Sequence, residues 1–284
     1  MNTQSDKNSL VWFITGTSNG FGRELVREAL RRGDSVIATS RNPQKVAEAF
    51  AEHKDRLLAV PMDSGNCDQI TKAVDAGISR FGKVDVLVNN AGYGFIGAVE
   101  EATDDEIKRV HETNVFGLLR VLRAVLPHFR ERKSGHVVNL SSIGGLIGLP
   151  GFGIYNSTKF AVEGISEALA AEVAPLGVKV TIVEPGPFRT EFLAGSLAMA
   201  ENEIPQYEKT AGATRAGASA RNGKQPGDPS RAAMAIIKAV TSEKPPLHLL
   251  LGRFAYEHMA DKIAKLQKDI ETWREVTLAA DFEN

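Results

Sequence analysis

The sequence is poor in cysteine and has no excess of charge of either sign. Cys67 is the only cysteine among 284 residues, which excludes an internal disulfide and a cluster of thiolate metal ligands. Lysine and arginine total 34 against 35 aspartates and glutamates, so no strongly basic surface is available for nucleic acid. No apolar run approaches the roughly 20 residues that cross a bilayer. We therefore expect no nucleic-acid partner and no membrane partner.

Two further features are missing. The polar lead-in at residues 1–9 lacks the apolar core of a signal peptide, so we expect a cytoplasmic protein. His111, His128, His136 and His258 are scattered without the spacing of metal ligands, so we expect no metal site. What is present is a hydrophobic fraction of 43%, enough for one large core. We predict a single domain over residues 10–284.

Short apolar runs alternate with helical patterns along most of the chain. Repeated units of this kind predict an α/β fold of Rossmann type, a doubly wound, mostly parallel sheet of about seven strands with helices on both faces. The loops that follow the strands then lie along one edge of the sheet. The strands are expected over residues 10–15, 35–39, 57–62, 84–88, 136–140, 178–183 and 247–251, and the helices over 23–32, from 43, over 68–81 and 103–129, and from Tyr155 to about 174.

Two stretches break this rhythm. Residues 192–228 have little apolar periodicity, which indicates a mobile flap that closes over bound substrate. Residues 254–275 form a predicted amphipathic helix, whose stripe we expect to dock on its own domain rather than on a partner. The stripe consists of Tyr256, Met259, Ile263, Leu266, Ile270 and Trp273.

The first strand is followed at once by Gly16-x-x-x-Gly20-x-Gly22 and a helix. Backbone N–H groups and the helix dipole attract phosphate at such a turn, and glycine lets a pyrophosphate approach the backbone. Any turn between a strand and a helix can use glycine, but the position after the first strand favours a dinucleotide site.

Tyr155 and Lys159 lie four residues apart, on one face of a predicted helix. The pKa of an unperturbed tyrosine is about 10, and a neighbouring ammonium favours the phenolate and lowers that pKa. On this pair alone, the alternative is a core aromatic beside a solvated lysine.

The order of motifs resembles the short-chain dehydrogenase/reductase family, in its shorter single-domain branch. Thr15-Gly16-x-x-x-Gly20-x-Gly22 is similar to the family's glycine turn, and Tyr155-x-x-x-Lys159 is similar to its active-site signature. The resemblance covers about residues 10–190. The remaining matching motifs are Asn89-Asn90-Ala91-Gly92, Asn114, Ser142 thirteen residues before Tyr155, and Pro185-Gly186 followed by Thr190.

The resemblance implies a role for each catalytic candidate. Tyr155 would be the general acid/base, and Ser142 would hydrogen-bond the substrate oxygen. Lys159 would lower the pKa of Tyr155 and bind the nicotinamide ribose, while Asn114 would hold a water that links Lys159 to solvent. Each role has an alternative. Ser142 only ends a strand and Ser141 is the catalytic serine instead. Asn114 is only a buried polar group of a helix.

The resemblance also implies the cofactor contacts. Asp63 would contact the adenine, although a turn or N-cap aspartate is the alternative. The other expected contacts are Gly16, Ser18, Asn19, Gly20, Phe21, Gly22, Asn90, Ala91, Gly92, Tyr155, Lys159, Pro185, Gly186 and Thr190.

The end of the second strand favours NADP(H) over NAD(H). An acidic residue here selects NAD, but the segment from Ala38 to Pro43 contains no carboxylate. The Arg41 guanidinium can pair with a 2′-phosphate, and Ser40 can add a hydroxyl. The alternative is that Arg41 is a solvated charge.

We therefore predict an NADP(H)-dependent oxidoreductase acting on a small-molecule carbonyl or secondary alcohol. The residues expected near the substrate are mostly apolar, without an arginine or lysine placed for an anion, which favours a lipophilic substrate: Tyr93, Gly94, Phe95, Leu146, Ile147, Leu149 and Phe152. A catalytically idle NADP(H)-sensing regulator and a sugar-nucleotide epimerase are the alternatives. A regulator of this kind usually lacks the catalytic tyrosine or lysine, and this chain has both. An epimerase needs a larger C-terminal domain than this chain offers. The resemblance further implies a homo-dimer or homo-tetramer.

Overall fold

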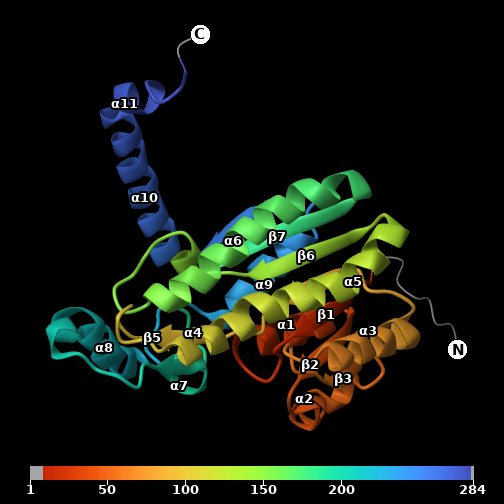
Figure 1. Cartoon of the computed structure of the whole chain (residues 1–284). Helices are drawn as coiled ribbons and strands as arrows, with labels where there is room; N and C mark the ends of the chain where they lie inside the picture. The colour runs from red at the N-terminus through yellow and green to blue at the C-terminus, as the bar shows by residue number, and fades with distance from the viewer. Residues whose placement is uncertain (1–8, 283–284) are drawn as a thin grey trace, which may run out of the picture.

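Strand β1 (Val11–Thr15) is buried on both faces of its sheet. The side chains of Trp12 and Ile14 enter one hydrophobic core, while those of Val11 and Phe13 enter a second core on the opposite face. A continuous apolar run is typical of a central parallel strand covered on both sides. The molecule therefore has three layers, a sheet with helices on each of its two faces. We describe it from a computed structural model that covers residues 9–282 (Figure 1).

Seven parallel strands form the main sheet, in the order β3-β2-β1-β4-β6-β7-β9. This confirms the predicted doubly wound α/β fold and its seven strands. The direction of winding changes between β1 and β4, which is where such sheets bind ligands beyond the strand ends. The strands are β1, β2 (Ser35–Ser40), β3 (Leu57–Pro61), β4 (Val86–Asn89), β6 (Gly135–Leu140), β7 (Val178–Pro185) and β9 (His248–Leu251).

Helices cover both faces of the sheet (Figure 1). Side chains of α1 (Gly20–Arg31), α2 (Pro43–Ala49) and α9 (Pro229–Val240) fill one core. Those of α3 (Cys67–Phe81), α5 (Leu118–Arg132) and α6 (Gly153–Val173) fill the other. The remaining helices are α4 (Asp104–His111), α7 (Phe192–Gly195), α8 (Ala213–Arg221), α10 (Arg253–Thr272) and α11 (Arg274–Leu278). No helix within residues 9–282 combines the length and apolar character needed to cross a membrane.

The predicted helix over residues 103–129 is interrupted. Thr103 and Glu106 form a capping box at the start of α4. Between α4 and α5, however, Glu112–Gly117 (η2) winds as a π-helix. Wider turns of this kind occur often at functional sites, and Asn114 lies in this one.

The segment 192–228 contains more regular structure than its sequence suggested. Strand β8 (Leu197–Met199) pairs with β5 (Gly94–Ile96) in a small second sheet, and α7 and α8 flank it. The buried Glu101 carboxylate holds this segment in place: it accepts from the Arg215 guanidinium at 2.9 Å and from the Ile204 N–H at 2.9 Å. Closure of the segment over substrate stays a prediction.

Docking of the C-terminal helix on its own domain, in contrast, is wrong for most of its length. Ala255 and Met259 near the start of α10 pack on the body, but Ile263, Leu266 and Ile270 are 53%, 52% and 58% exposed. Figure 1 shows α10 and α11 standing away from the sheet. The spacing of the apolar residues predicts a helix with one apolar face. It does not predict the direction in which that helix leaves β9. The expected lead-in at residues 1–9 lies outside the described residues except for Ser9.

Candidate active site

The glycine turn between β1 and α1 forms the floor of a large cleft. Gly16 has φ +71°, and a side chain at this position would contact the Ala91 backbone at 2.9 Å. A Cβ at Gly22 would lie 2.4 Å from the Gly16 carbonyl oxygen, so neither position accepts a larger residue. The N-terminus of α1 therefore faces open space bounded by bare backbone, which fits a pyrophosphate.

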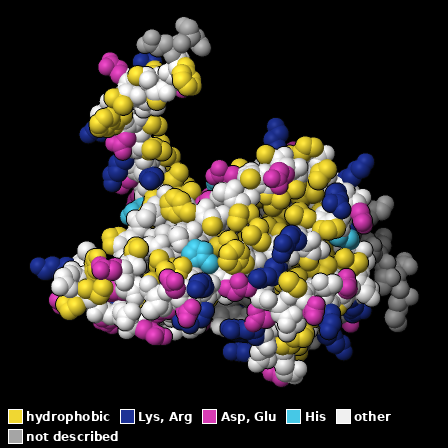
Figure 2. Space-filling model, viewed as in Figure 1, with side chains coloured by type: hydrophobic (Ala, Val, Ile, Leu, Met, Phe, Trp, Pro, Cys, Tyr) yellow, Lys and Arg dark blue, Asp and Glu magenta, His cyan; other side chains and the backbone are white. Residues whose placement is uncertain are grey.

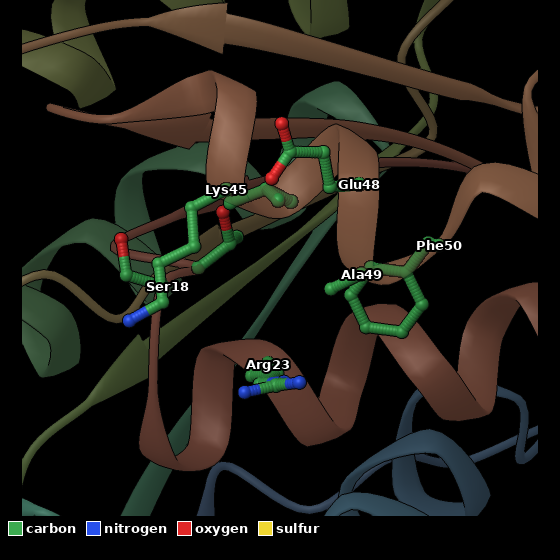
Figure 3. A pocket seen from close by; sticks show the side chains of 8 residues that line it. Ser18, Arg23, Lys45, Glu48, Ala49 and Phe50 are labelled. Atoms are coloured by element: carbon green, nitrogen blue, oxygen red, sulfur yellow. The ribbon is translucent and has the colours of Figure 1, made fainter.

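The end of β2 is joined to this turn by hydroxyl groups. Ser18 and Ser40 hydrogen-bond through their Oγ atoms at 2.8 Å, and the side chain of the neighbouring Arg41 is exposed at the rim of the cleft. A smaller hollow of about 320 Å³ opens beside Ser18 and is lined by Arg23 and Lys45 (Figure 3). The Nε atom of Arg23 is buried there without a hydrogen-bond partner. The sequence did not single out Arg23 or Lys45, because each lies in a segment with an ordinary helical pattern.

The segment after β4 closes the second side of the turn. The Thr15 hydroxyl accepts the N–H groups of Asn90 and Ala91, each at 2.9 Å. The Asn90 side chain donates to the carbonyls of Thr15 and Gly16 at 2.8 and 2.9 Å. Asn90 thus fixes the shape of the glycine turn from behind.

Asn114 supports the cleft wall from within the π-helical turn and does not itself line the cleft. Its Oδ1 accepts the Tyr93 N–H at 3.0 Å, and its Nδ2 donates to the Tyr93 carbonyl at 2.9 Å and to the Thr158 hydroxyl at 3.1 Å. It is buried, and it connects the loop after β4 to the helix that carries Tyr155. Among the other predicted site residues, only Gly22 also stays behind the cleft surface.

Ser142, Tyr155 and Lys159 all line the same side of the cleft. Ser142 follows β6, and its Oγ accepts the Gly144 N–H at 3.0 Å, so its hydroxyl hydrogen can be donated to the Tyr155 hydroxyl or to a substrate oxygen. Tyr155 lies one turn before Lys159 on α6, with its ring 5.7 Å from that of Phe192. Lys159 is buried, and its Nζ donates to the Leu140 carbonyl at 2.7 Å.

The expected lowering of the Tyr155 pKa by Lys159 is not found in this arrangement. Burial raises the pKa of Tyr155 to about 12, and the hydrogen bond with Ser142 only partly opposes the rise. Burial also lowers the pKa of Lys159 to about 8, against the attraction of the Glu163 carboxylate. The Lys159 ammonium points at a backbone carbonyl and lies 5.8 Å from the centre of the Tyr155 ring, so burial dominates both groups.

Asp63 and the segment after β7 complete the expected set. Asp63 lines the cleft, but its Oδ1 also accepts the Gly65 N–H at 2.8 Å, so it serves as a turn aspartate at the same time. Pro185 ends β7, Gly186 approaches the backbone of α10, and Thr190 lies next to Gly20. All three line the cleft.

The cleft has a volume of about 1060 Å³ and runs from the glycine turn to the segment 192–228. Leu149, Phe152 and Tyr93 line it as expected, whereas Leu146 and Ile147 pack instead in a small core with α10. Gly94 and Phe95 belong to β5 and do not line it either.

Arg221, Lys224 and Gln225 are among the polar residues of the cleft that were not anticipated. Arg221 and Lys224 line it from the end of α8, which corrects the expectation that no cation is placed for an anionic group. Gln225 also lines it, is 4% exposed, and has no hydrogen-bond partner at either side-chain atom. Their segment lacks periodicity, so the sequence contained no signal for which side chains turn inward.

Comparisons with known proteins agree with this geometry. The family model of the short chain dehydrogenases matches residues 10–201. An oxidoreductase named BOA17 from Botryotinia fuckeliana is 40% identical over 271 residues, 95% of this chain and 98% of that protein. A 3-ketodihydrosphingosine reductase of Bacteroides thetaiotaomicron is 42% identical over 182 residues, 64% of this chain and 65% of that protein.

Solved structures show the same fold, two of them in complex with a nicotinamide cofactor. A short-chain dehydrogenase from Streptomyces avermitilis has 42% identity and a TM-score of 0.91, over 97% of this chain and 100% of that one. A 3-ketoacyl-(acyl-carrier-protein) reductase from Brucella melitensis, complexed with NADH, has 27% identity and a TM-score of 0.72, over 85% and 96%. A short chain dehydrogenase from Burkholderia cenocepacia, complexed with NADP, has 25% identity and a TM-score of 0.72, over 93% and 97%. The chain belongs to the short-chain dehydrogenase/reductase family and is an oxidoreductase with a cleft for a nicotinamide cofactor.

Proposed function

We propose that the protein is an NADP(H)-dependent reductase of lipophilic ketones, able to oxidise the corresponding secondary alcohols. The observation that carries the proposal is the placement of Ser142, Tyr155 and Lys159 on one side of the cleft whose floor is the glycine turn. The bound nicotinamide supplies or accepts the hydride. The chain's own task is to hold the carbonyl and deliver a proton to its oxygen.

Tyr155 is the proton donor in this proposal. With a pKa of about 12 it carries its proton throughout the neutral range, the form that an acid needs in carbonyl reduction. Ser142 donates its hydroxyl hydrogen to the same substrate oxygen. Lys159 offsets the phenolate charge after the transfer, and Asn114 holds a water through which the proton is replaced.

Three cations support the preference for NADP(H). Arg41 lies at the rim beside Ser40, and Ser18 lines both the main cleft and the hollow that contains Arg23 and Lys45 (Figure 3). The segment from Ala38 to Pro43 contains no carboxylate; Asp63 and Glu191 line the main cleft from other segments, and Glu48 belongs to the smaller hollow. A 2′-phosphate carries about two negative charges near neutrality, which suits this cationic border.

The substrate class rests on the apolar part of the cleft. Leu149, Phe152 and Phe192 lie around Tyr155, and Leu193 and Leu197 extend the apolar lining toward α8. The relative named 3-ketodihydrosphingosine reductase supports a long-chain ketone. Arg221, Lys224 and Gln225 are placed to bind a polar end of such a molecule or of the cofactor.

Assembly and compartment are also proposals. We propose a homo-oligomer formed through the face that contains Phe116 and Phe160, which are 48% and 46% exposed. Figure 2 shows apolar side chains gathered over α5 and α6 on this face. The single exposed thiol of Cys67 suits the reducing cytoplasm as the proposed compartment.

A substrate screen tests the function. The purified protein is mixed with NADPH or NADH and a panel of ketones that runs from short polar keto acids to long-chain 3-keto lipids, and absorbance of the reduced nicotinamide is followed. We expect turnover to be fastest with NADPH and the lipophilic ketones. NADPH binding without turnover of any ketone or alcohol would contradict the proposal and favour the nucleotide-sensing alternative.

A further inference from the structure

A cluster of ionisable side chains lies outside the cleft, where α6 crosses the edge of the sheet. Glu163 and Glu167 are one turn apart on α6, Glu184 is on β7 and His248 begins β9. None of the four lines the cofactor cleft. The proposed reaction therefore does not explain why three carboxylates and an imidazole meet here.

His248 is oriented by a buried carboxylate. Its Nδ1 lies 2.6 Å from Oε1 of Glu184, a side chain with no exposed surface. When Nδ1 donates to Glu184, the lone pair of the imidazole is on Nε2, which lies 3.8 Å from Oε1 of Glu167. Metal-binding histidines are held in this way, with the second ring nitrogen donating to a carboxylate.

Glu163 provides an independent sign that a ligand is missing. Its side chain is 6% exposed, and neither carboxylate oxygen has a hydrogen-bond partner. The Ser141 hydroxyl lies nearby without hydrogen-bond geometry, and the Lys159 ammonium donates to Leu140 instead. Oε2 of Glu163 lies 3.9 Å from Nδ1 of His248. A buried carboxylate without donors is costly unless a cation compensates it.

We propose that Glu163, Glu167 and His248 bind one zinc ion, with Glu184 orienting His248. One ligand atom from each of the three residues lies within 4.8 Å of the other two. Zn–N and Zn–O bonds of about 2.0–2.2 Å place two ligands roughly 3–4 Å apart, so small side-chain shifts close the site. A nitrogen with two carboxylate oxygens suits zinc, and water completes a four-coordinate ion.

The surroundings allow the ion to enter and to stabilise the fold. The side chains of Glu167 and His248 are 55% and 42% exposed, so the site opens to solvent on one side. A bound ion would join α6 to the edge strand β9, one helical turn beyond Lys159. It would thus anchor the helix that carries the proposed proton donor.

Zinc titration of the metal-stripped full-length protein by calorimetry tests the proposal. We expect one zinc per chain for the wild type, with affinity at least about tenfold lower in Glu167→Gln. Glu172→Gln is the matched control, because Glu172 is an exposed carboxylate on the same helix outside the cluster. We expect this control to bind as the wild type does.

Cobalt(II) provides the second measurement, because its visible absorption reports nitrogen and oxygen ligands directly. We expect a saturable band for the wild type and Glu172→Gln that is absent in Glu167→Gln. Equal zinc affinity of the wild type and Glu167→Gln would overturn the proposal, as would the lack of saturable zinc uptake. The cluster would then be an imidazole held among carboxylates without a metal ion.

Discussion

At the residue scale, burial determines the chemistry of Tyr155 and Lys159 more than their proximity does. Both side chains are more than nine-tenths buried, and burial raises the pKa of Tyr155 to about 12 while it lowers that of Lys159 to about 8. Neutral forms are favoured in both cases because charge is costly away from water. A protonated tyrosine beside a lysine that titrates near neutrality suits proton delivery to a carbonyl.

Arg41 allows a direct test of cofactor choice at this scale. Arg41→Asp should lower the ratio of NADPH to NADH affinity about tenfold or more, because a charge-assisted pair with the 2′-phosphate is replaced by repulsion. Lys54→Asp, which makes the same charge change at an exposed site that does not line the cleft, is the control. Dissociation constants from fluorescence titration check both. Equal affinity of the wild type for the two cofactors would contradict the role of Arg41.

Residue identities in the cleft were predictable where a motif places them, and not elsewhere. The glycine turn and Ser142 each follow a strand, and Tyr155 shares a helix face with Lys159. The order of these motifs along the chain therefore predicts that they meet at one edge of the sheet. Gln225 lies in an aperiodic loop, and His248 meets Glu163 across 85 positions of chain, as the numbering shows. Only the folded chain brings such pairs together.

At the element scale, β6 contains a buried histidine that makes stability depend on pH. His136 is 4% exposed and contacts the Thr181 hydroxyl at 2.9 Å. Burial, and secondarily the charge of Lys179, lowers its pKa to about 4, whereas an unfolded histidine titrates near 6.5. The unfolded state therefore binds more protons between these values, and stability is lost as the pH falls from 6.5 toward 4.

The measurement is urea unfolding at pH 7 and pH 5. The wild type should lose about 1–2 kcal/mol more than His136→Gln between these two pH values, since glutamine keeps a polar contact to Thr181 but does not titrate. A loss of the same size in both proteins would show that His136 is not the group responsible.

Helices and strands were predictable where the spacing of the apolar residues and the length of the segment indicate the same type of element. All seven main strands were found because each is a short, mostly apolar run next to a turn signal. The break at η2 was not, because one extra residue in a helical turn hardly alters the apolar period. Strands β5 and β8 have three residues each, too few for a period to show.

At the scale of the whole molecule, two apolar surfaces remain uncovered by the described chain. One is the face with Phe116 and Phe160, and the other is the projecting stripe of α10 (Figure 2). Large exposed apolar patches mark interaction surfaces. The sequence showed that these residues are apolar, but a single chain contains no information on what covers them.

Sedimentation tests the proposed assembly. We expect a homo-dimer or homo-tetramer at micromolar concentration, and a shift toward monomer in Phe160→Glu, because a charge in an apolar interface is not solvated. Met234→Glu is the matched control, since Met234 on α9 is also 46% exposed but lies on the opposite layer. A wild-type monomer mass would contradict the proposal.

The most direct test of the whole account replaces the proposed proton donor. Tyr155→Phe should lower the rate of NADPH-dependent ketone reduction by 10²–10⁴-fold, the usual range for loss of a general acid, while NADPH affinity is retained. Tyr93→Phe, in a tyrosine that lines the same cleft, should keep the wild-type rate within a few fold. Wild-type turnover by Tyr155→Phe would contradict the central claim that Tyr155 delivers the proton.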